Sequence, residues 1–285
     1  MEYDFGNSRS EFWVRIYQND DGSCVFITNK HTLNIVNYFF SYLENISPKG
    51  WTITNNNNYS LWIPPNNLND NDIQAFNQWA NNCNTHIWLK TNKNIEKQFM
   101  DELNYCVASD WNFSFETNTR TNVGEAEYKL KYHYPKGKIN AKEAANYSDI
   151  LANAIMDCFQ YLPIENTTSI LVTSIPSNRE NLSWGMAKYV CNKLNVSLLS
   201  SNLKVEKQQT KGLSIDQKIE MWDSIYKCGQ VDLTETVYGK TVLIVDDLYQ
   251  SGTSIWSFAK HLKSMGTSLV YGLVAVKSQR DSDNQ

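Results

Sequence analysis

The stretch that decides the fold reads Thr241-Val242-Leu243-Ile244-Val245-Asp246-Asp247-Leu248-Tyr249-Gln250-Ser251-Gly252-Thr253-Ser254. Its apolar run at 241–245 is typical of a strand buried on both faces of a parallel sheet. Two acids follow the run, and a short loop of small residues then leads into a helical pattern at 253–265. Ligands of open α/β sheets bind outside the carboxyl ends of the strands. The stretch therefore predicts a ligand site.

The loop at 250–254 has the composition of an anion site. Its residues are Gln250, Ser251, Gly252, Thr253 and Ser254. Backbone N–H groups at the start of a helix point at a bound anion, and the hydroxyl groups add further donors. Gly252 lets the backbone approach a phosphate group without a Cβ atom in the way. We therefore expect a phosphate group at this loop.

The two acids beside the loop, Asp246 and Asp247, indicate the rest of the ligand. If they faced the phosphate they would repel it, but they can accept hydrogen bonds from sugar hydroxyls next to it. Loop and acids together predict a sugar 5-phosphate. The alternative is an Asp-Asp pair of another kind, as in Walker B strands and response regulators. A Walker protein also carries a Gly-x-x-x-x-Gly-Lys-Ser/Thr loop, and this sequence has none.

With this combination, residues 241–254 resemble the fingerprint of the type I phosphoribosyltransferases, although Tyr249 and Gln250 depart from its usual small or aliphatic residues. The resemblance implies the parallel-sheet α/β fold of that family and 5-phosphoribosyl 1-pyrophosphate (PRPP) as ligand. It also implies that Asp246 and Asp247 hold the ribose 2- and 3-hydroxyls, while the loop holds the 5-phosphate. Mg²⁺ is the implied cofactor, contacting both acids only indirectly, through ribose and water.

Other segments resemble the competence-protein-F-like branch of these transferases. They are Tyr128-Lys129-Leu130-Lys131-Tyr132, a helical pattern at 141–159 and a short apolar strand at 169–173. The resemblance implies a pyrophosphate-binding loop made of Ser174, Ile175, Pro176 and Ser177, with Arg179 nearby. It also implies a mobile loop within 204–218. Its basic residues are Lys204, Lys207, Lys211 and Lys218, of which Lys207 and Lys211 are the candidate site residues. An ordinary turn after the strand and an ordinary surface loop are the alternatives.

Two departures from this branch matter. The branch carries Arg-x-Arg-Gly before its next helix, whereas this chain has Leu182-Ser183-Trp184-Gly185. The positive charge at this edge of the expected ligand site is therefore lower. The branch also often begins with a Cys-x-x-Cys zinc module, and none occurs here.

The predicted organisation is an N-terminal α+β domain of unknown role at 1–113, a linker at 114–123, and a phosphoribosyltransferase-like domain at 124–285. Alternating residues at 12–16 and 24–28 predict a hairpin, and the spacing at 95–107 predicts a helix. Two strand-helix-strand patterns, at 169–199 and 241–276, favour a parallel sheet. Only residues 277–285 follow the last predicted strand, so we expect any acceptor-binding hood in the N-terminal region. Its tryptophans (Trp51, Trp62, Trp79, Trp88 and Trp111) would either stack on a flat ring or fill the core.

Composition narrows the function classes. With a net charge of −4 the sequence has no excess of basic residues for binding nucleic acid, so a nucleic-acid partner is not expected. Six scattered cysteines, an acidic start without an apolar segment and the lack of long apolar runs favour a cytoplasmic protein without membrane spans.

The expected activity is transfer of the 5-phosphoribosyl group from PRPP to a nucleobase-like nitrogen acceptor, with release of pyrophosphate. Two alternatives stay open: a non-catalytic PRPP- or nucleotide-sensing protein of the same fold, and an interaction protein. The N-terminal domain is the expected surface for a homodimer contact or a protein partner.

Overall fold

The computed structural model describes residues 1–6, 9–91, 93–206 and 212–279. The chain divides into two compact units, one formed by Met1–Trp88 with Tyr161–Pro163 and the other by Leu89–Gln160 with Ile164–Gln285. This division lies earlier than the predicted linker at 114–123. The reason is that Tyr105–Trp111, expected to belong to the N-terminal domain, forms an inner strand of the second unit.

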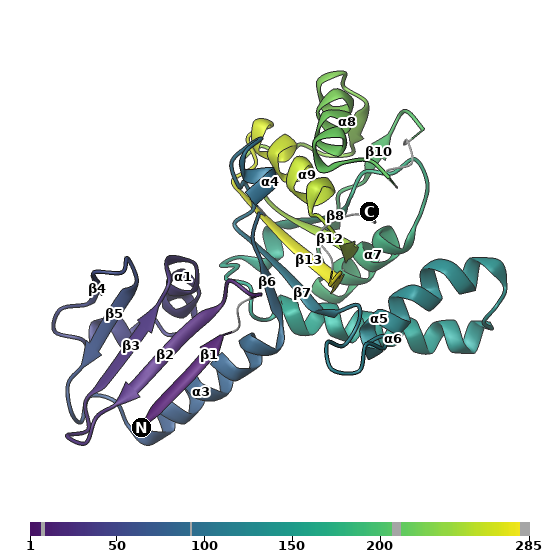
Figure 1. Ribbon diagram of the computed structural model, residues 1–285. Coiled ribbons are helices and arrows are strands. Elements are labelled where there is room, and N and C mark those ends of the chain that lie inside the picture. Colours follow the sequence, from purple (N-terminus) through teal and green to yellow (C-terminus); the bar gives the residue numbers. More distant parts are fainter. Residues whose placement is uncertain (7–8, 92, 207–211, 280–285) are drawn as a thin grey trace. The chain divides into compact units, whose positions relative to one another are not determined.

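The first unit is an antiparallel sheet with helices, as its α+β pattern predicts (Figure 1). Its strand order is β1-β2-β3-β5-β4. The elements are β1 (Glu2–Gly6), β2 (Trp13–Gln18), β3 (Cys24–Thr28), α1 (Lys30–Phe39), α2 (Tyr42–Asn45), β4 (Trp51–Ile53), β5 (Tyr59–Ile63) and α3 (Asp70–Thr85). The predicted hairpin at 12–28 is confirmed, since β2 pairs with β3 in antiparallel register from Val14–Thr28 to Gln18–Cys24.

Aromatic side chains fill the core of this unit. Phe12 stacks on Trp88 with ring centroids 5.8 Å apart and meets Trp79 edge-on at 5.7 Å. Phe26 and Phe76 pack edge-to-face at 5.0 Å. Trp79 and Trp88 therefore belong to the packing of the first unit, which is the second of the two roles considered for the tryptophans.

The second unit is built on a six-stranded sheet of order β6-β7-β13-β12-β8-β9, and the boundary between the two units falls within its edge strand β6. Its strands are β6 (Ile87–Leu89), β7 (Tyr105–Trp111), β8 (Ile170–Ser174), β9 (Ser197–Leu198), β12 (Thr241–Tyr249) and β13 (Leu269–Lys277). The five strands from β7 to β9 pair in parallel. The expected α/β fold with a parallel sheet and an additional N-terminal α+β unit is thus confirmed.

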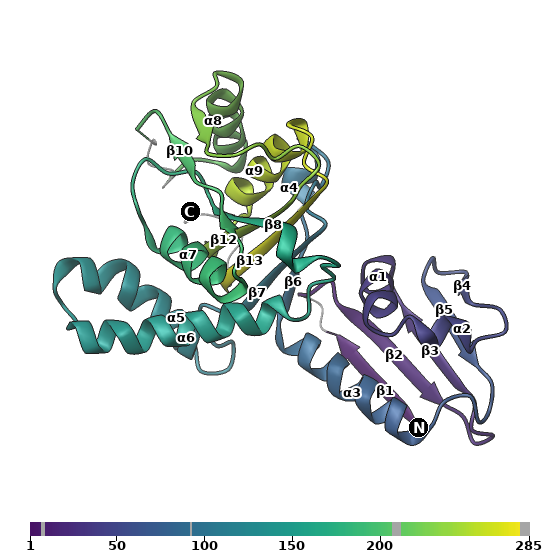
Figure 2. The same cartoon turned by 180° about the vertical axis from the view of Figure 1, so that it is seen from behind.

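Helices cover both faces of this sheet. α5 (Asn122–Tyr128), α6 (Ala141–Phe159) and α7 (Leu182–Leu194) pack against one another and the sheet, and α9 (Thr253–Ser264) packs against β13 (Figure 2). A π-helical turn, η1 (Lys129–His133), continues α5 and is followed by the 3₁₀ turn η2 (Tyr134–Lys136). A second 3₁₀ turn, η3 (Thr167–Ser169), precedes β8. None of these or the other described helices is long and apolar enough to cross a membrane.

Two stretches differ from their sequence patterns. The predicted helix at 95–107 is wrong: α4 (Lys93–Glu96) is a single turn, and β7 begins at Tyr105 because its parallel pairing with β13 outweighs helical spacing. The polar stretch 200–238 contains structure, namely the antiparallel pair β10 (Ser201–Leu203) and β11 (Val231–Leu233) with α8 (Ile215–Lys227) between them. Lys207 and Lys211 lie outside the described residues.

Candidate ligand-binding site

A cavity of about 1190 Å³ opens at the carboxyl ends of β8 and β12. Its described lining comes from the second unit alone. It is formed by η1, η2, α6, the loop after β8, the first turn of α7, Glu206, α8, the end of β12 and the start of α9 with the loop at 250–254. β8 leads through α7 to β9 on one side, whereas β12 leads through α9 to β13 on the other. The cavity therefore lies at the point where the strand order reverses, which is where open α/β sheets bind ligands.

The predicted phosphate loop lies together in this cavity, since all of Gln250, Ser251, Gly252, Thr253 and Ser254 line it. Gly252 is the N-cap of α9 with φ of +80°, and no side chain of the cap residue bonds the first turn. By contrast α6, α7 and α8 each begin with an Asn or Ser side-chain cap. The first-turn N–H groups of α9 thus lack the side-chain acceptor that the other three helices have, as an anion site requires.

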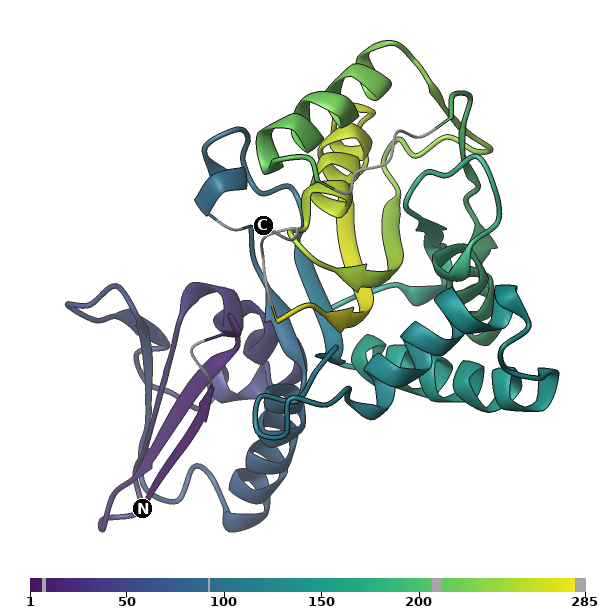
Figure 3. The ribbon, with the colours of Figure 1, turned by 45° about the vertical axis from the view of Figure 1, so that its right-hand side comes forward.

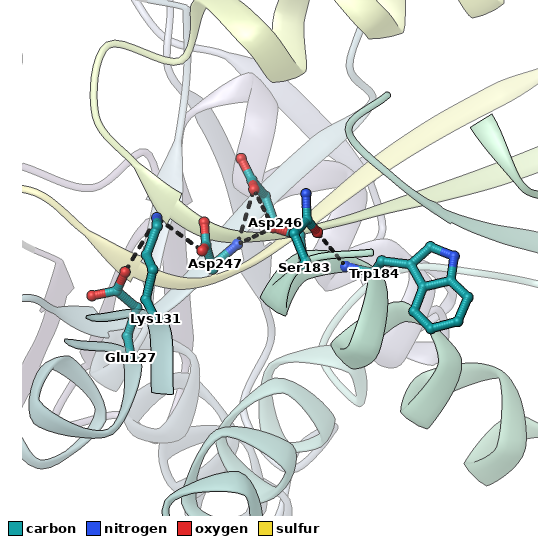
Figure 4. Close-up of polar contacts among 7 residues, drawn as sticks. Glu127, Lys131, Ser183, Trp184, Asp246 and Asp247 are labelled. Atoms are coloured by element: carbon teal, nitrogen blue, oxygen red, sulfur yellow. Dashed lines mark hydrogen bonds and ion pairs between the residues drawn. The ribbon is translucent and has the colours of Figure 1, made fainter. Parts of the chain in front are cut away.

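The acid pair follows the buried part of β12, as predicted, but its two members have different surroundings. Asp246 Oδ1 accepts hydrogen bonds from Ser183 Oγ at 2.9 Å and from the Asp247 N–H at 2.9 Å (Figure 4). Burial and then the neighbouring Asp247 carboxylate raise the pKa of Asp246 to about 7. Ser183 thereby links the first turn of α7 to the acid pair.

Asp247 belongs to a charged cluster with Lys131 and Glu127. Lys131 Nζ lies 2.8 Å from Asp247 Oδ2 and 3.3 Å from Glu127 Oε1, between the two carboxylates in Figure 4. Burial alone would lower the pKa of Lys131, but the carboxylates of Asp247 and Glu127 outweigh it and raise that pKa. Burial raises the pKa of Glu127 to about 7. The negative charge of Asp247 is therefore already balanced by a cation of the protein, Lys131.

The predicted pyrophosphate loop is brought to the cavity in part. Ile175, Pro176, Ser177 and Arg179 line it, with the Arg179 side chain exposed. Ser174 is not among the lining residues: it is the buried last residue of β8, and its carbonyl accepts a hydrogen bond from Ser201 Oγ at 2.8 Å. Because Ser174 is paired within the sheet, it does not reach the cavity. The loop that lines the cavity therefore begins at Ile175, one residue later than predicted.

Two site residues were not singled out by the sequence pattern, and a third was expected in a mobile loop. Lys131 stood only within a segment that resembles a family motif, and Ser183 only within a motif that had lost its charges. Lys218 was part of the basic stretch 204–218 and lies on α8, where it is buried and lines the cavity. Among the described residues, no group of three or more His, Cys, Asp or Glu side chains is placed to hold a metal ion.

Comparison with known proteins gives fold-level likeness only. No family model matches the chain, and no curated protein matches it either. Solved structures that resemble it include a hypoxanthine phosphoribosyltransferase from Staphylococcus aureus (15% identity, TM-score 0.30) and an adenine phosphoribosyltransferase from Thermoanaerobacter pseudethanolicus (16%, 0.31). A purine phosphoribosyltransferase from Pyrococcus horikoshii is a third (10%, 0.29).

Each match covers 48% of this chain, and 65%, 82% and 90% of the three respective chains. The match thus spans less than two thirds of the Staphylococcus aureus protein. At such TM-scores the likeness carries no argument about the site, which rests on the geometry of this chain.

Proposed function

We propose that the cavity binds PRPP and that the protein is a phosphoribosyltransferase acting on a nucleobase-like nitrogen acceptor. One observation carries the proposal: a helix N-terminus without a side-chain cap and a pair of adjacent carboxylates share one cavity at the switch point of a parallel sheet. The first suits a phosphate group and the second suits vicinal hydroxyls. A ribose 5-phosphate carries both a phosphate group and vicinal hydroxyls.

In this arrangement the 5-phosphate lies against the loop at 250–254 and the ribose hydroxyls face Asp246 and Asp247. The pyrophosphate group extends toward Ser177 and Arg179, whose guanidinium is exposed at the same cavity. A guanidinium offers phosphate oxygens two parallel hydrogen bonds. Holding both ends of PRPP fixes its C1 atom for attack, which is catalysis by positioning. Membership in the competence-protein-F-like branch is part of the same proposal.

The residues present are compatible with Mg²⁺. Adjacent Asp246 and Asp247 supply hard oxygen donors, and Mg²⁺ typically takes one or two carboxylates together with substrate phosphates and water. When bound, the ion would neutralise the pyrophosphate and make it a better leaving group. The pairing of Asp247 with Lys131 supports a contact between the acids and Mg²⁺ that runs through ribose and water.

The transfer breaks the bond from C1 to the pyrophosphate oxygen and forms a bond from C1 to the acceptor nitrogen. Pyrophosphate leaves with the bonding electron pair, and the acceptor nitrogen loses a proton to solvent. Positive charge develops on the ribose ring in between. Asp246 and Asp247 place negative charge next to that ring and so stabilise the transition state.

One observation favours a second candidate, a PRPP- or nucleotide-sensing protein without turnover. Lys131 is a fixed cation beside the place where positive charge would develop, and it is bonded to one of the two acids. A cation there opposes an oxocarbenium-like transition state unless Glu127 and Asp247 balance it. Incubation with PRPP, Mg²⁺ and a panel of nucleobases separates the candidates. Pyrophosphate release supports the transferase, while tight PRPP binding without release supports the sensor.

The binding proposal is tested by titrating PRPP into the wild type and into the double variant Asp246→Asn/Asp247→Asn. Each lost charge-assisted hydrogen bond contributes about 1.5–3 kcal/mol, so we expect affinity to fall at least about 10-fold. Asp20→Asn, at an exposed turn of the first unit, is the control and should bind normally. Unchanged affinity in the double variant would falsify the ribose assignment.

A further inference from the structure

The helix α8 is held firmly against α9. The rings of Tyr226 and His261 stack at 4.3 Å with an angle of 12°, and Trp222 stacks on Tyr226 at 5.5 Å and 14°. Asp223 on α8 and Lys260 on α9 form an ion pair of 3.4 Å. Figures 1 and 3 both show α8 lying alongside α9. Because α9 begins at the phosphate loop, these contacts also determine where α8 lies relative to that loop.

A hydrogen bond joins α8 directly to the loop. The indole Nε1–H of the fully buried Trp222 donates to Ser254 Oγ at 3.2 Å. Ser254 is one of the residues expected to bind the 5-phosphate. α8, whose first residues fall in the predicted mobile loop at 204–218, therefore supports the phosphate site through this hydrogen bond.

Lys218 lies one turn before Trp222 on the same face of α8, because residues four apart on a helix are neighbours. Only 5% of its surface is exposed, and it lines the same cavity as Ser251, Thr253 and Ser254. Placing an ammonium group so deep is costly unless charge or hydrogen bonds compensate it. Lys218 also has interactions of its own within the protein. Because it is shielded from water at this wall of the cavity, its charge would act on a ligand with little screening.

The phosphate loop contains no cationic side chain: its five residues offer only amide, hydroxyl and backbone donors. The nearby acids add negative charge, and Lys131 is bonded to Asp247 and Glu127. A phosphate dianion at this loop therefore gains from a cation supplied by another element. The exposed Glu206 also lines the cavity, so Lys218 is not the sole charged group there.

We propose that Lys218 of α8 binds the 5-phosphate of the ligand, as a cation supplied from outside the phosphate loop. This assignment rests on the proposed function, since it specifies how the same cavity takes a ribose 5-phosphate. It makes α8 part of the binding site rather than a mobile lid, and it predicts that the phosphate end of the ligand is recognised by its charge.

The test measures the affinities of PRPP and ribose 5-phosphate for the wild type, Lys218→Met, Lys218→Arg and Lys227→Met. Lys227 lies on the same helix with 78% of its side chain exposed, which makes it the matched control. Loss of a charge-assisted hydrogen bond should weaken both ligands by the same factor in Lys218→Met, about 10- to 100-fold. Lys218→Arg should recover part of the affinity, and Lys227→Met should bind like the wild type.

Equal loss for both ligands is the supporting result, because the 5-phosphate is the anionic group that they share. A loss for PRPP alone would place Lys218 at the pyrophosphate and overturn the assignment. Wild-type affinity in Lys218→Met would also overturn it while leaving the proposed function intact. If the wild type binds neither compound, the proposed function fails as well. Circular dichroism of each variant checks folding, and Lys218→Gln replaces Lys218→Met if the latter does not fold.

Discussion

At the scale of single residues, the cluster of Glu127, Lys131 and Asp247 is the most consequential feature. Three charged side chains from α5, η1 and β12 meet where the sequence indicated only a pair of acids. Removing Lys131 would leave both carboxylates without this partner, whereas removing one carboxylate would leave Lys131 paired with the other. Effects on stability and on ligand binding must therefore be measured together for these residues.

Replacing Lys131 by Met should destabilise the protein. Breaking a fully buried ion pair costs about 3–5 kcal/mol, and we expect about 2 kcal/mol here because 30% of the Lys131 side chain is exposed. Urea denaturation measures the free energy of unfolding. In the double variant Glu127→Gln/Lys131→Met the loss should be smaller than in Lys131→Met alone, since one buried carboxylate is then neutral. A double variant less stable by the sum of both single effects would show that the pair is not coupled.

Glu127 should also give the protein a measurable dependence on pH. Its pKa is about 7 in the folded chain against a usual 4.5, so between these values the folded state binds more protons than the unfolded state. The stabilisation is fully present below pH 4.5 and is lost as pH rises through about 7. Asp246, with its pKa raised to about 7, acts in the same direction.

We therefore expect the free energy of unfolding to fall from pH 5 to pH 8, with each group contributing up to about 1.4 kcal/mol per pH unit. Glu127→Gln should flatten this slope, because Gln imitates the protonated carboxyl at every pH. Denaturation series at several pH values measure both slopes. Equal slopes in wild type and variant would mean that Glu127 ionises normally.

At the scale of elements, the turn from β12 into α9 depends on one glycine. Gly252 has φ of +80°, and a Cβ atom there would lie 2.2 Å from Tyr249 Oη and 2.7 Å from Trp256 Cδ1. Those two side chains are themselves joined by a hydrogen bond from Trp256 Nε1 to Tyr249 Oη of 2.7 Å. The departure at Tyr249 from the usual aliphatic residue thus has a local role, since its ring closes the space beneath the phosphate loop.

Gly252→Ala should lower both stability and PRPP affinity. Gly137→Ala is the matched control, because Gly137 also has a positive φ, of +64°, but no atom lies within 4 Å of its Cβ position. The left-handed backbone alone costs about 1–2 kcal/mol, which we expect for Gly137→Ala. The clash should raise the loss to about 3 kcal/mol or more in Gly252→Ala. Similar stabilities and PRPP affinities for the two variants would show that the loop has room for a side chain.

The elements also show what the sequence could and could not predict. The strand at 241–245 and the helices at 141–159, 182–194 and 253–264 follow from local patterns, so they were predictable. The helix expected at 95–107 failed because pairing with β13, more than 160 residues later, decides the structure of β7. For the same reason Lys131 and Ser183 could not be assigned to the site, and Lys218 could be placed only in a mobile loop. The three residues reach the site from η1, α7 and α8, and only tertiary packing brings these elements together.

At the scale of the whole molecule, the chain has two cores. The aromatic core of Phe12, Trp79 and Trp88 belongs to the first unit, and the parallel sheet with its cavity belongs to the second. The domain boundary at Leu89 differs from the predicted linker because β7 carries no sequence signal of its pairing partner. The candidate site needs no residue of the first unit for its described lining.

This separation predicts the response of thermal unfolding to ligand. PRPP at 100 times its dissociation constant stabilises the unit that binds it by about 2.7 kcal/mol. Differential scanning calorimetry should therefore show two transitions, of which PRPP with Mg²⁺ shifts one upward and leaves the other in place. The shift should disappear in Asp246→Asn/Asp247→Asn, whose first unit is unchanged. If PRPP moved both transitions by the same amount, or if the chain unfolded in one step, the two units would unfold as a single cooperative structure.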